Sequence, residues 1–359
     1  MLEAAIVGAT GVVGQQFILA LQGHPWFRIS GLYATKRSAG KKYRDAITEG
    51  GVMRWYQDEP AKDEIMEMKV RDVEKLDPRD YDLIFTGVES EFARELEPRL
   101  AKRRPVISTA SAFRYEDDVP ILIPGVNDAH ARLIEAQRER RGWDGFIVPI
   151  PNCTTTGLVV SMKPIYDSFG IELVIMTSMQ AVSGAGRRGG VLALDIIDNV
   201  IPYIPKEEEK VEAESRKILG KYEGGRIIPA EFGVSCTCTR VNVRDGHTEA
   251  VYLSLKKRAS VDEVKEAMRE FAPKLYSIGL PSAPRETIVV LEDEARPQPR
   301  LDRDTQGGMA TVVGRIREDK ALKNGIKYVL VSHNTKMGAA KGAVLVAELL
   351  SKLGYIKRP

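Results

Sequence analysis

The stretch that decides the fold of the N-terminal part is Gly8-Ala9-Thr10-Gly11-Val12-Val13-Gly14. It follows a short apolar run, residues 2–7, and apolar side chains then recur at helical spacing as far as Leu21. This order predicts a strand, a glycine turn and a helix. In such a turn the backbone can approach a pyrophosphate, whose charge then lies at the helix N-terminus. We therefore expect a dinucleotide-binding loop, with a turn that serves only packing as the alternative.

The segment after the second predicted strand, residues 29–34, indicates which nucleotide fits. An Asp or Glu at this place would bind the ribose 2′-hydroxyl of NAD, but the chain has Thr35-Lys36-Arg37-Ser38. Two cations and two hydroxyls suit a 2′-phosphate. The segment predicts NADP as the cofactor, with Thr35, Arg37 and Ser38 near its phosphate. A solvated basic loop is the alternative interpretation.

Strands and helices alternate over the first part of the chain, which is typical of a parallel sheet. Further strands are expected over residues 81–86 and 106–108, with a helix over 92–102 between them. Beyond Pro149 the strands become longer and richer in β-branched residues, which favours an α+β arrangement. We expect an α/β protein in which residues 1–150 plus 334–359 form a Rossmann-type NADP-binding domain. Residues 151–333 are expected to form an α+β catalytic and dimerisation domain.

The composition of the 359 residues excludes several classes of protein. Lys and Arg total 53 against 50 Asp and Glu, so the surface has mixed charge and not the basic arm typical of nucleic-acid binding. No apolar run reaches the ~20 residues of a membrane span, and the first residues lack the build of a signal peptide. Three cysteines make no disulfide framework. We expect a cytoplasmic protein with no nucleic-acid or membrane partner.

Cys153 is the candidate nucleophile. It stands in Pro151-Asn152-Cys153, just before a helix predicted over residues 158–168. The positive end of a helix dipole and free amide donors lower the pKa of a thiol, so we expect a reactive thiolate here. Cys236 and Cys238 alternate along a predicted strand and are interpreted as core residues. Their spacing is poor for metal ligands, and we expect no metal.

His247 is the candidate proton-transfer group. It follows Asp245-Gly246, a dipeptide typical of a two-residue hairpin turn between strands. In such a hairpin Arg244 lies opposite His247, and Arg240 lies on the same face roughly 13 Å away. A small acid could then bridge a basic side chain and an imidazole. A structural role for His247 is the alternative.

Taken together, the motifs of this chain resemble those of the aspartate-β-semialdehyde dehydrogenase family, in the branch found in archaea and fungi. The resemblance covers nearly the whole chain. The matching segments are residues 8–14, Pro151-Asn152-Cys153, Gln180 to Gly186, Asp198 to Pro202, Arg240 to His247, Arg296 to Arg300, and Asn334-Thr335. Arg187-Arg188 depart from it, because the family usually has Tyr-Pro at that place.

The resemblance implies reduction of L-aspartyl-4-phosphate by NADPH to aspartate semialdehyde, on the route to lysine, threonine, methionine and isoleucine. It implies that Cys153 forms a thioester with the substrate. It makes His247 the general acid and base, and it makes Gln180 the residue that positions the reacting group. It also implies that Arg240 holds the substrate α-carboxylate as a bidentate pair.

The resemblance further assigns Lys210 and Arg114 to the substrate phosphate. A glutamate shortly before that lysine would hold the amino group. Spacing selects Glu207 from the run Glu207-Glu208-Glu209, with a solvated acidic helix start as the alternative. The residues implied to contact the cofactor are Gly8, Thr10, Gly11, Val12, Val13, Thr35, Arg37, Ser38, Ser183, Gly184 and Asn334. Members of the family pair through the second domain, so we expect a homodimer or a homotetramer.

Several other functions fit part of this pattern. A malonyl- or succinyl-CoA reductase would share the thiol and the NADP site, but it would not need Glu207 and Lys210. An N-acetyl-glutamyl-phosphate reductase would not need the glutamate. A non-catalytic, redox-sensing NADP-binding protein would not need Arg240, Gln180 and His247 together. A cysteine hydrolase would have no use for a nucleotide loop.

Overall fold

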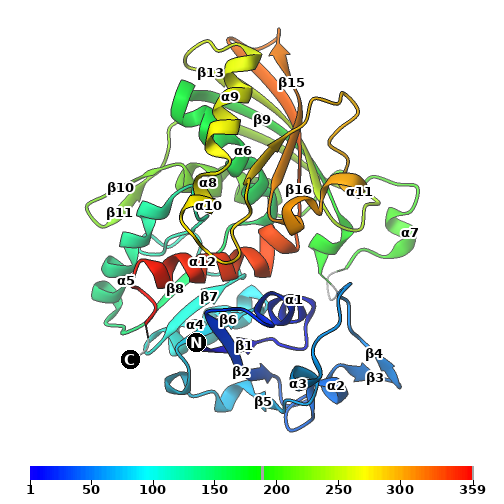
Figure 1. The fold of residues 1–359 in the computed structure, drawn as a ribbon, viewed down its shortest axis with the longest axis vertical. Helices are drawn as coiled ribbons and strands as arrows, with labels where there is room; N and C mark the ends of the chain where they lie inside the picture. The colour runs from blue at the N-terminus through cyan, green and yellow to red at the C-terminus, as the bar shows by residue number, and fades with distance from the viewer. Residues whose placement is uncertain (187–189, 358–359) are drawn as a thin grey trace.

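The computed structural model describes residues 1–186 and 190–357, and it contains two six-stranded sheets that form the lower and upper halves of Figure 1. The N-terminal sheet has the strand order β5-β2-β1-β6-β7-β8, and its neighbouring strands are parallel. This confirms the predicted Rossmann-type parallel sheet. Its strands are β1 (Leu2–Val7), β2 (Phe27–Ala34), β5 (Val70–Asp72), β6 (Leu83–Thr86), β7 (Pro105–Ser108) and β8 (Phe146–Pro149).

Helices pack on both faces of this sheet because its strands are apolar on both sides. Ala4 and Ile6 of β1 face a core shared with α1 (Val12–Leu21) and α12 (Lys341–Lys352). Ala5 and Val7 face the opposite core, which includes apolar residues of α4 (Ser90–Ala101). The C-terminal helix α12 therefore packs against the first helix of the chain, and Figure 1 shows it lying between the two sheets.

The remaining α-helices and strands of the N-terminal half are short, apart from one helix of nine residues. They are α2 (Tyr43–Ala46), β3 (Thr48–Glu49), β4 (Val52–Met53), α3 (Asp63–Met66) and α5 (Leu133–Arg141). Four of these lie along the chain between β2 and β5. In the described parts of the chain, no helix is long and apolar enough to cross a bilayer.

The second sheet is mixed, with the strand order β12-β9-β13-β16-β15-β14. Pairs β12–β9 and β14–β15 are parallel, and the other neighbours are antiparallel. This confirms the predicted α+β character of the second half. The strands are β9 (Ile171–Gln180), β12 (Gly233–Arg240), β13 (His247–Leu255), β14 (Ile288–Val290), β15 (Thr311–Asp319) and β16 (Gly325–Ser332).

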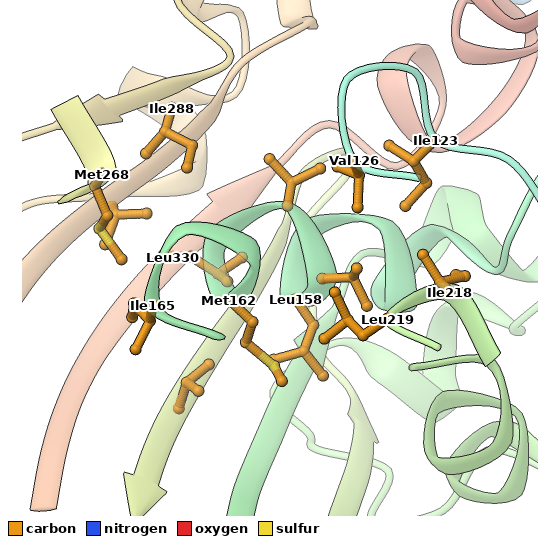
Figure 2. Packing of buried hydrophobic residues seen from close by; sticks show 14 of the residues in the cluster. Ile123, Val126, Leu158, Met162, Ile165, Ile218, Leu219, Met268, Ile288 and Leu330 are labelled. Atoms are coloured by element: carbon orange, nitrogen blue, oxygen red, sulfur yellow. The ribbon is translucent and has the colours of Figure 1, made fainter. Parts of the chain in front are cut away.

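One face of the second sheet is covered by helices, above all by α6 (Cys153–Phe169). Figure 2 shows Leu158, Met162 and Ile165 of α6 pointing into a core that includes Leu330 of β16. Cys236 and Cys238 lie in this core, which confirms their prediction as core residues. The other elements of this half are α7 (Ala193–Ile196), α8 (Glu207–Ile218), β10 (Lys221–Glu223), β11 (Arg226–Ile228), α9 (Val261–Phe271), α10 (Lys274–Ser277) and α11 (Pro299–Asp302).

The predicted hairpin between Arg240 and His247 is wrong. Strands β12 and β13 follow one another along the chain, but β9 lies between them in the sheet, pairing with β12 in parallel and with β13 in antiparallel fashion. The residues from 241 to 246 therefore form a crossover loop and not a two-residue turn. Arg244 is exposed on this loop, where it pairs with Asp58 and Asp245 and does not face His247.

Candidate active site

A cavity of about 670 Å³ opens where β6, β7 and β8 end, between the N-terminal sheet and the second half of the chain. A ligand site at the carboxyl ends of parallel strands is the rule for open α/β sheets. Most of the residues proposed from the sequence line this cavity: Val12, Val13, Arg114, Cys153, Gln180, Ser183, Gly184, Glu207, Lys210, Arg240 and Asn334. The structure thus gathers positions from the whole length of the chain into one site.

Cys153 is the first residue of α6 and lies next to His247, the first residue of β13. The distance from Cys153 Sγ to His247 Nε2 is 3.1 Å. The backbone N–H of Ala181 donates to the other ring nitrogen, Nδ1, over 3.1 Å. Because Nδ1 accepts this bond, a neutral imidazole must carry its proton on Nε2. His247 therefore presents an N–H donor to the sulfur.

The thiol and the imidazole are both neutral in this arrangement. Burial raises the pKa of the Cys153 thiol to about 12, and the carboxylate of Glu207 adds to the effect. Burial also lowers the pKa of His247 to about 3, with a further contribution from the cation Arg240. The expected lowering of the thiol pKa is wrong, although the backbone N–H of Thr154 does act in that direction. Desolvation outweighs the helix N-terminus here.

Three adjacent strands bring Arg240, Gln180 and His247 to one end of the second sheet. Arg240 of β12 is directly paired with Gln180 of β9, and Met179 of β9 pairs with Thr248, next to His247. Arg240 is buried, and its Nη1 donates to the carbonyl of Ala181 over 2.8 Å. The two residues that the hairpin was expected to join are thus brought together through β9.

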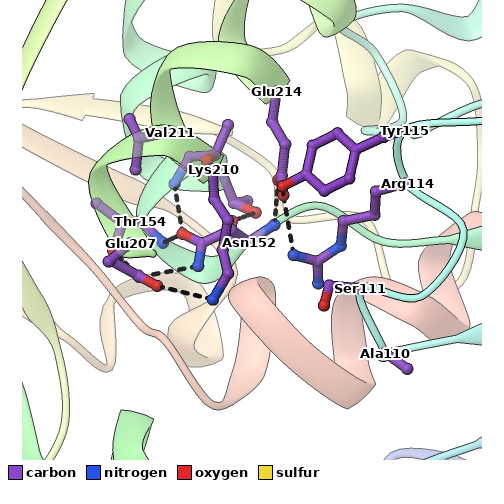
Figure 3. A network of polar contacts seen from close by, with 12 residues as sticks. Ala110, Ser111, Arg114, Tyr115, Asn152, Thr154, Glu207, Lys210, Val211 and Glu214 are labelled. Atoms are coloured by element: carbon purple, nitrogen blue, oxygen red, sulfur yellow. Dashed lines mark hydrogen bonds and ion pairs between the residues drawn. The ribbon is translucent and has the colours of Figure 1, made fainter. Parts of the chain in front are cut away.

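Glu207 is the central acceptor of the site. It is buried at the start of α8, and its Oε1 accepts from Asn152 Nδ2 at 2.8 Å and from Gln180 Nε2 at 3.1 Å. Lys210 Nζ donates to its Oε2 over 3.4 Å. Figure 3 shows Glu207 and Lys210 projecting from α8 toward Asn152. The choice of Glu207 over Glu208 agrees with this placement, because Glu208 bonds to the backbone of Cys238 instead.

Arg114 reaches the same cavity from the loop after β7. Its side chain is 7% exposed and forms an ion pair with Glu214 over 3.0 Å. Its Nη2 donates to the carbonyl of Thr109. Arg114 and Lys210 thus place two cations along the cavity wall. Such a pair suits a phosphate group.

The glycine turn after β1 is built for close backbone approach. Gly8 has φ +79°, and a Cβ on it would lie 2.4 Å from the carbonyl oxygen of Gly87. A Cβ on Gly14 would lie 2.2 Å from the carbonyl oxygen of Gly8. Gly11 is the N-cap residue of α1 and has no side chain to cap it. The free N–H groups of α1 are therefore open to a pyrophosphate, and these residues fit a dinucleotide.

The other predicted cofactor residues lie on either side of this turn. The amides of Gly8 and Ala9 bond to Tyr33 of β2, so Thr35, Arg37 and Ser38 follow directly beside the turn, outside the lining of the cavity. Gly8, Thr10 and Gly11 also lie outside that lining. On the far side, Asn334 donates through Nδ2 to the hydroxyl of Ser183 at 2.9 Å. Arg187 and Arg188 lie outside the described residues.

Comparisons with known proteins agree with this geometry. Residues 3–134 match the model of the semialdehyde dehydrogenase NAD binding domain, and residues 162–337 match that of the semialdehyde dehydrogenase dimerisation domain. Aspartate-semialdehyde dehydrogenase of Methanothermobacter thermautotrophicus is 47% identical over 98% of this chain and 100% of its own length. That of Saccharomyces cerevisiae is 41% identical over 97% of each chain. The chain belongs to the aspartate-semialdehyde dehydrogenase family.

The resemblance to archaeal and fungal members is therefore confirmed. A crystal structure of aspartate semialdehyde dehydrogenase with NADP from Candida albicans superimposes with a TM-score of 0.88, at 39% identity over 99% of this chain and 100% of that one. The fold expected for the family, with an N-terminal Rossmann-type sheet, is the fold observed. As a member of a family with a dimerisation domain, the protein forms a homo-oligomer.

Two residues of the site were missed in the sequence. Asn152 precedes Cys153 in the predicted motif, and its Oδ1 accepts from the amides of Thr154 and Thr155 and caps α6. An Asn just before a helix is a recognisable cap signal. Glu214 belongs to none of the predicted motifs. It lies seven residues after Glu207, on the same face of α8, and this spacing is the one signal that could have found it.

Proposed function

We propose that the protein is an aspartate-semialdehyde dehydrogenase that converts L-aspartyl-4-phosphate and NADPH to L-aspartate 4-semialdehyde, phosphate and NADP. The observation that carries this proposal is the contact of 3.1 Å between Cys153 Sγ and His247 Nε2, in a cavity that also reaches the first turn of α1. A nucleophile beside a nucleotide loop fits reduction of an acyl group.

The first half of the reaction forms a thioester. Cys153 Sγ attacks the acyl carbon, the carbon–oxygen bond to phosphate breaks, and the thiol proton leaves with the phosphate. Arg114 and Lys210 stabilise the charge on the departing phosphate. Because the neighbouring imidazole already carries its proton on Nε2, His247 does not take the thiol proton. Its N–H instead stabilises the sulfur as negative charge develops on it.

The second half reduces the thioester. Bound NADPH supplies a hydride to the acyl carbon, the carbon–sulfur bond then breaks, and the aldehyde is released. The Nε2–H of His247 donates a hydrogen bond to the departing sulfur, and a proton from solvent then restores the thiol. The sulfur lies within hydrogen-bond distance of that N–H, so little movement of the side chains is required. Gln180 and Arg240 position the substrate, with Arg240 at its α-carboxylate and Glu207 at its amino group.

An assay in both directions tests the proposal. Purified protein should reduce NADP when aspartate semialdehyde and inorganic phosphate are both present, and omission of phosphate should stop the reaction. Malonyl-CoA and succinyl-CoA with NADPH should give less than about a hundredth of that rate, because neither offers an amino group to Glu207. A higher rate with either CoA ester would overturn the choice of substrate.

We also propose the division of the chain and its assembly. Residues 1–150 plus 334–359 bind NADP, and residues 151–333 carry the catalytic groups and the subunit contact. The packing of α12 on α1 supports this division. The outer face of the second sheet is half-exposed along β9, β12 and β13, and the segment around α7 exposes apolar side chains. Covering these surfaces favours a homodimer, or a tetramer built from it.

The three unpaired cysteines fit a reducing compartment, and we propose that the enzyme works in the cytoplasm.

The most exposed apolar residues of the segment around α7 are Leu192, Leu194, Ile197, Val200 and Tyr203. Light scattering at micromolar concentration should show a dimer or a tetramer. A species of only 39.8 kDa would contradict the proposed assembly.

A further inference from the structure

We propose that Glu214 is a positioning residue that couples binding of an anion at Arg114 to the placement of Cys153. Its carboxylate joins two parts of the site that the chain itself keeps apart: the guanidinium on the loop after β7 and the backbone at the start of α6. The proposal rests on the proposed function for the identity of the anion, a phosphate group. The coupling itself follows from contacts within this chain.

Three donors converge on the one carboxylate, as Figure 3 shows. Oε1 of Glu214 accepts from Arg114 Nη1 over 3.0 Å and from the hydroxyl of Tyr115 over 3.2 Å. Oε2 accepts from the backbone N–H of Asn152 over 2.6 Å. The Glu214 side chain is fully buried. Both oxygens of this carboxylate therefore act as acceptors, and the group links Arg114 and Tyr115 to the backbone of Asn152.

Asn152 connects Glu214 to the nucleophile, because it contacts Glu214 and directly precedes Cys153. It is the residue before Cys153 and the N-cap of α6, because its Oδ1 accepts from Thr154 N at 2.9 Å and from Thr155 N at 3.2 Å. Glu207 holds its side-chain amide and Glu214 holds its backbone N–H. The two glutamates are seven residues apart on one face of α8, about two helical turns. Helix α8 thus fixes the residue that orients the sulfur.

Arg114 connects Glu214 to the cavity, because it pairs with Glu214 and also lines the space where an anion would bind. Its Nη1 and Nη2 are tied to Glu214 and Thr109, and its buried Nε–H has no acceptor in the described part of the chain. Each Nη still has a second N–H, and the residue lines the cavity. An anion that binds there shares the cation with Glu214 and weakens the ion pair. The hydrogen bond from Asn152 then strengthens, and the start of α6 is held more tightly.

The test is the rate at which iodoacetamide alkylates Cys153, measured with and without inorganic phosphate. In the wild-type protein phosphate should change the rate by about 3-fold or more. In Glu214→Gln the change should disappear, because the amide cannot accept from both Arg114 and Asn152. Glu209→Gln, on the exposed side of the same helix, is the matched control and should behave as wild type. Cys236 and Cys238 are buried, and mass spectrometry of the labelled peptide identifies the site.

Kinetics of semialdehyde oxidation give a second readout. Glu214→Gln should lower KM for phosphate by about 3-fold or more, because the ion pair with Glu214 opposes the anion at Arg114, and it should leave KM for NADP within 2-fold of the wild-type value. Glu214→Asp keeps the charge but is one methylene shorter, and it should give an intermediate KM for phosphate. It also serves if the glutamine variant does not fold. A phosphate effect on alkylation that survives in both variants overturns the proposal. If Glu214→Gln loses the phosphate effect on alkylation but the wild-type protein does not oxidise the semialdehyde, the coupling stands. Only the proposed function is then overturned.

Discussion

The sulfur of Cys153 and Nε2 of His247 lie 3.1 Å apart, although 94 residues separate them in the chain. Both groups are neutral, because burial raises the pKa of the thiol and lowers that of the imidazole. This pair differs from the thiolate–imidazolium pair common among cysteine nucleophiles. It makes His247 a hydrogen-bond donor to the sulfur.

Replacing Cys153 with alanine should abolish turnover and leave NADP binding within about 2-fold of the wild-type value. The thiol forms the covalent bond, whereas the turn at Gly8 provides nucleotide affinity, so the two functions separate. Titration of cofactor fluorescence measures binding, and the coupled assay measures turnover. Residual activity above a thousandth of the wild-type rate would contradict covalent catalysis by Cys153.

Replacing His247 with asparagine should lower kcat by about 100- to 1,000-fold with a smaller change in KM, since its N–H stabilises negative charge on the sulfur mainly in the chemical step. The pH profile gives an independent check. Because the pKa of His247 is lowered to about 3, its neutral form prevails from pH 5 to 8. We expect no acid limb near pH 6.5 in kcat/KM of the wild-type enzyme. A limb at that pH that vanishes in His247→Asn would show an ordinary imidazole instead.

Replacing Arg240 with lysine should raise KM for aspartate semialdehyde by about 10- to 100-fold, since a charged hydrogen bond is worth ~1.5–3 kcal/mol. An ammonium restores the charge but not the paired donors that a carboxylate accepts, nor the bond to the carbonyl of Ala181. Steady-state kinetics with varied semialdehyde measure the effect. If kcat falls and KM stays constant, Arg240 acts on the chemistry and not on binding.

Replacing Arg37 with alanine should raise KM for NADP about 10-fold and leave KM for NAD unchanged. The side chain is exposed beside the glycine turn, where a 2′-phosphate would meet it and a 2′-hydroxyl would not. Lys41→Ala, another exposed cation nearby in the chain, is the control. A wild-type enzyme that prefers NAD would refute the predicted cofactor.

Glu97 should make the stability of the protein depend on pH. This buried carboxyl of α4 accepts from Thr86 and Ser108, and burial raises its pKa to about 7. The folded state therefore binds more protons than the unfolded state between about pH 4.5 and 7, so the free energy of unfolding falls as the pH rises through this range. The loss is at most about 3 kcal/mol. In Glu97→Gln the side-chain carbonyl oxygen can still accept from the hydroxyls of Thr86 and Ser108.

Urea denaturation of the two proteins at several pH values measures this effect. The wild-type free energy of unfolding should fall more steeply between pH 5 and 8 than that of Glu97→Gln. Equal slopes for the two proteins would show that Glu97 does not titrate in this range.

Local patterns were enough to predict several parts of this protein. The glycines at 8 and 14, after an apolar run and before a helical period, predicted the nucleotide turn because a strand, a tight turn and a helix are encoded by neighbouring residues. Alternation along the chain placed Cys236 and Cys238 in the core for the same reason. The family resemblance, carried by ordered motifs, brought Cys153 and His247 together as partners.

Tertiary structure decided what depends on partners distant in sequence. The dipeptide Asp245-Gly246 has a strong hairpin preference, but β12 and β13 both pair with β9, which separates the two strands. The helix N-terminus lowers the pKa of Cys153, but only the folded chain shows that burial prevails. The contact of Glu214 with Asn152 requires α8 to lie against α6. Turns and helices thus depend on residues that are neighbours in the sequence. Strand order, burial and charge pairing depend on how the whole chain packs to remove apolar surface from water.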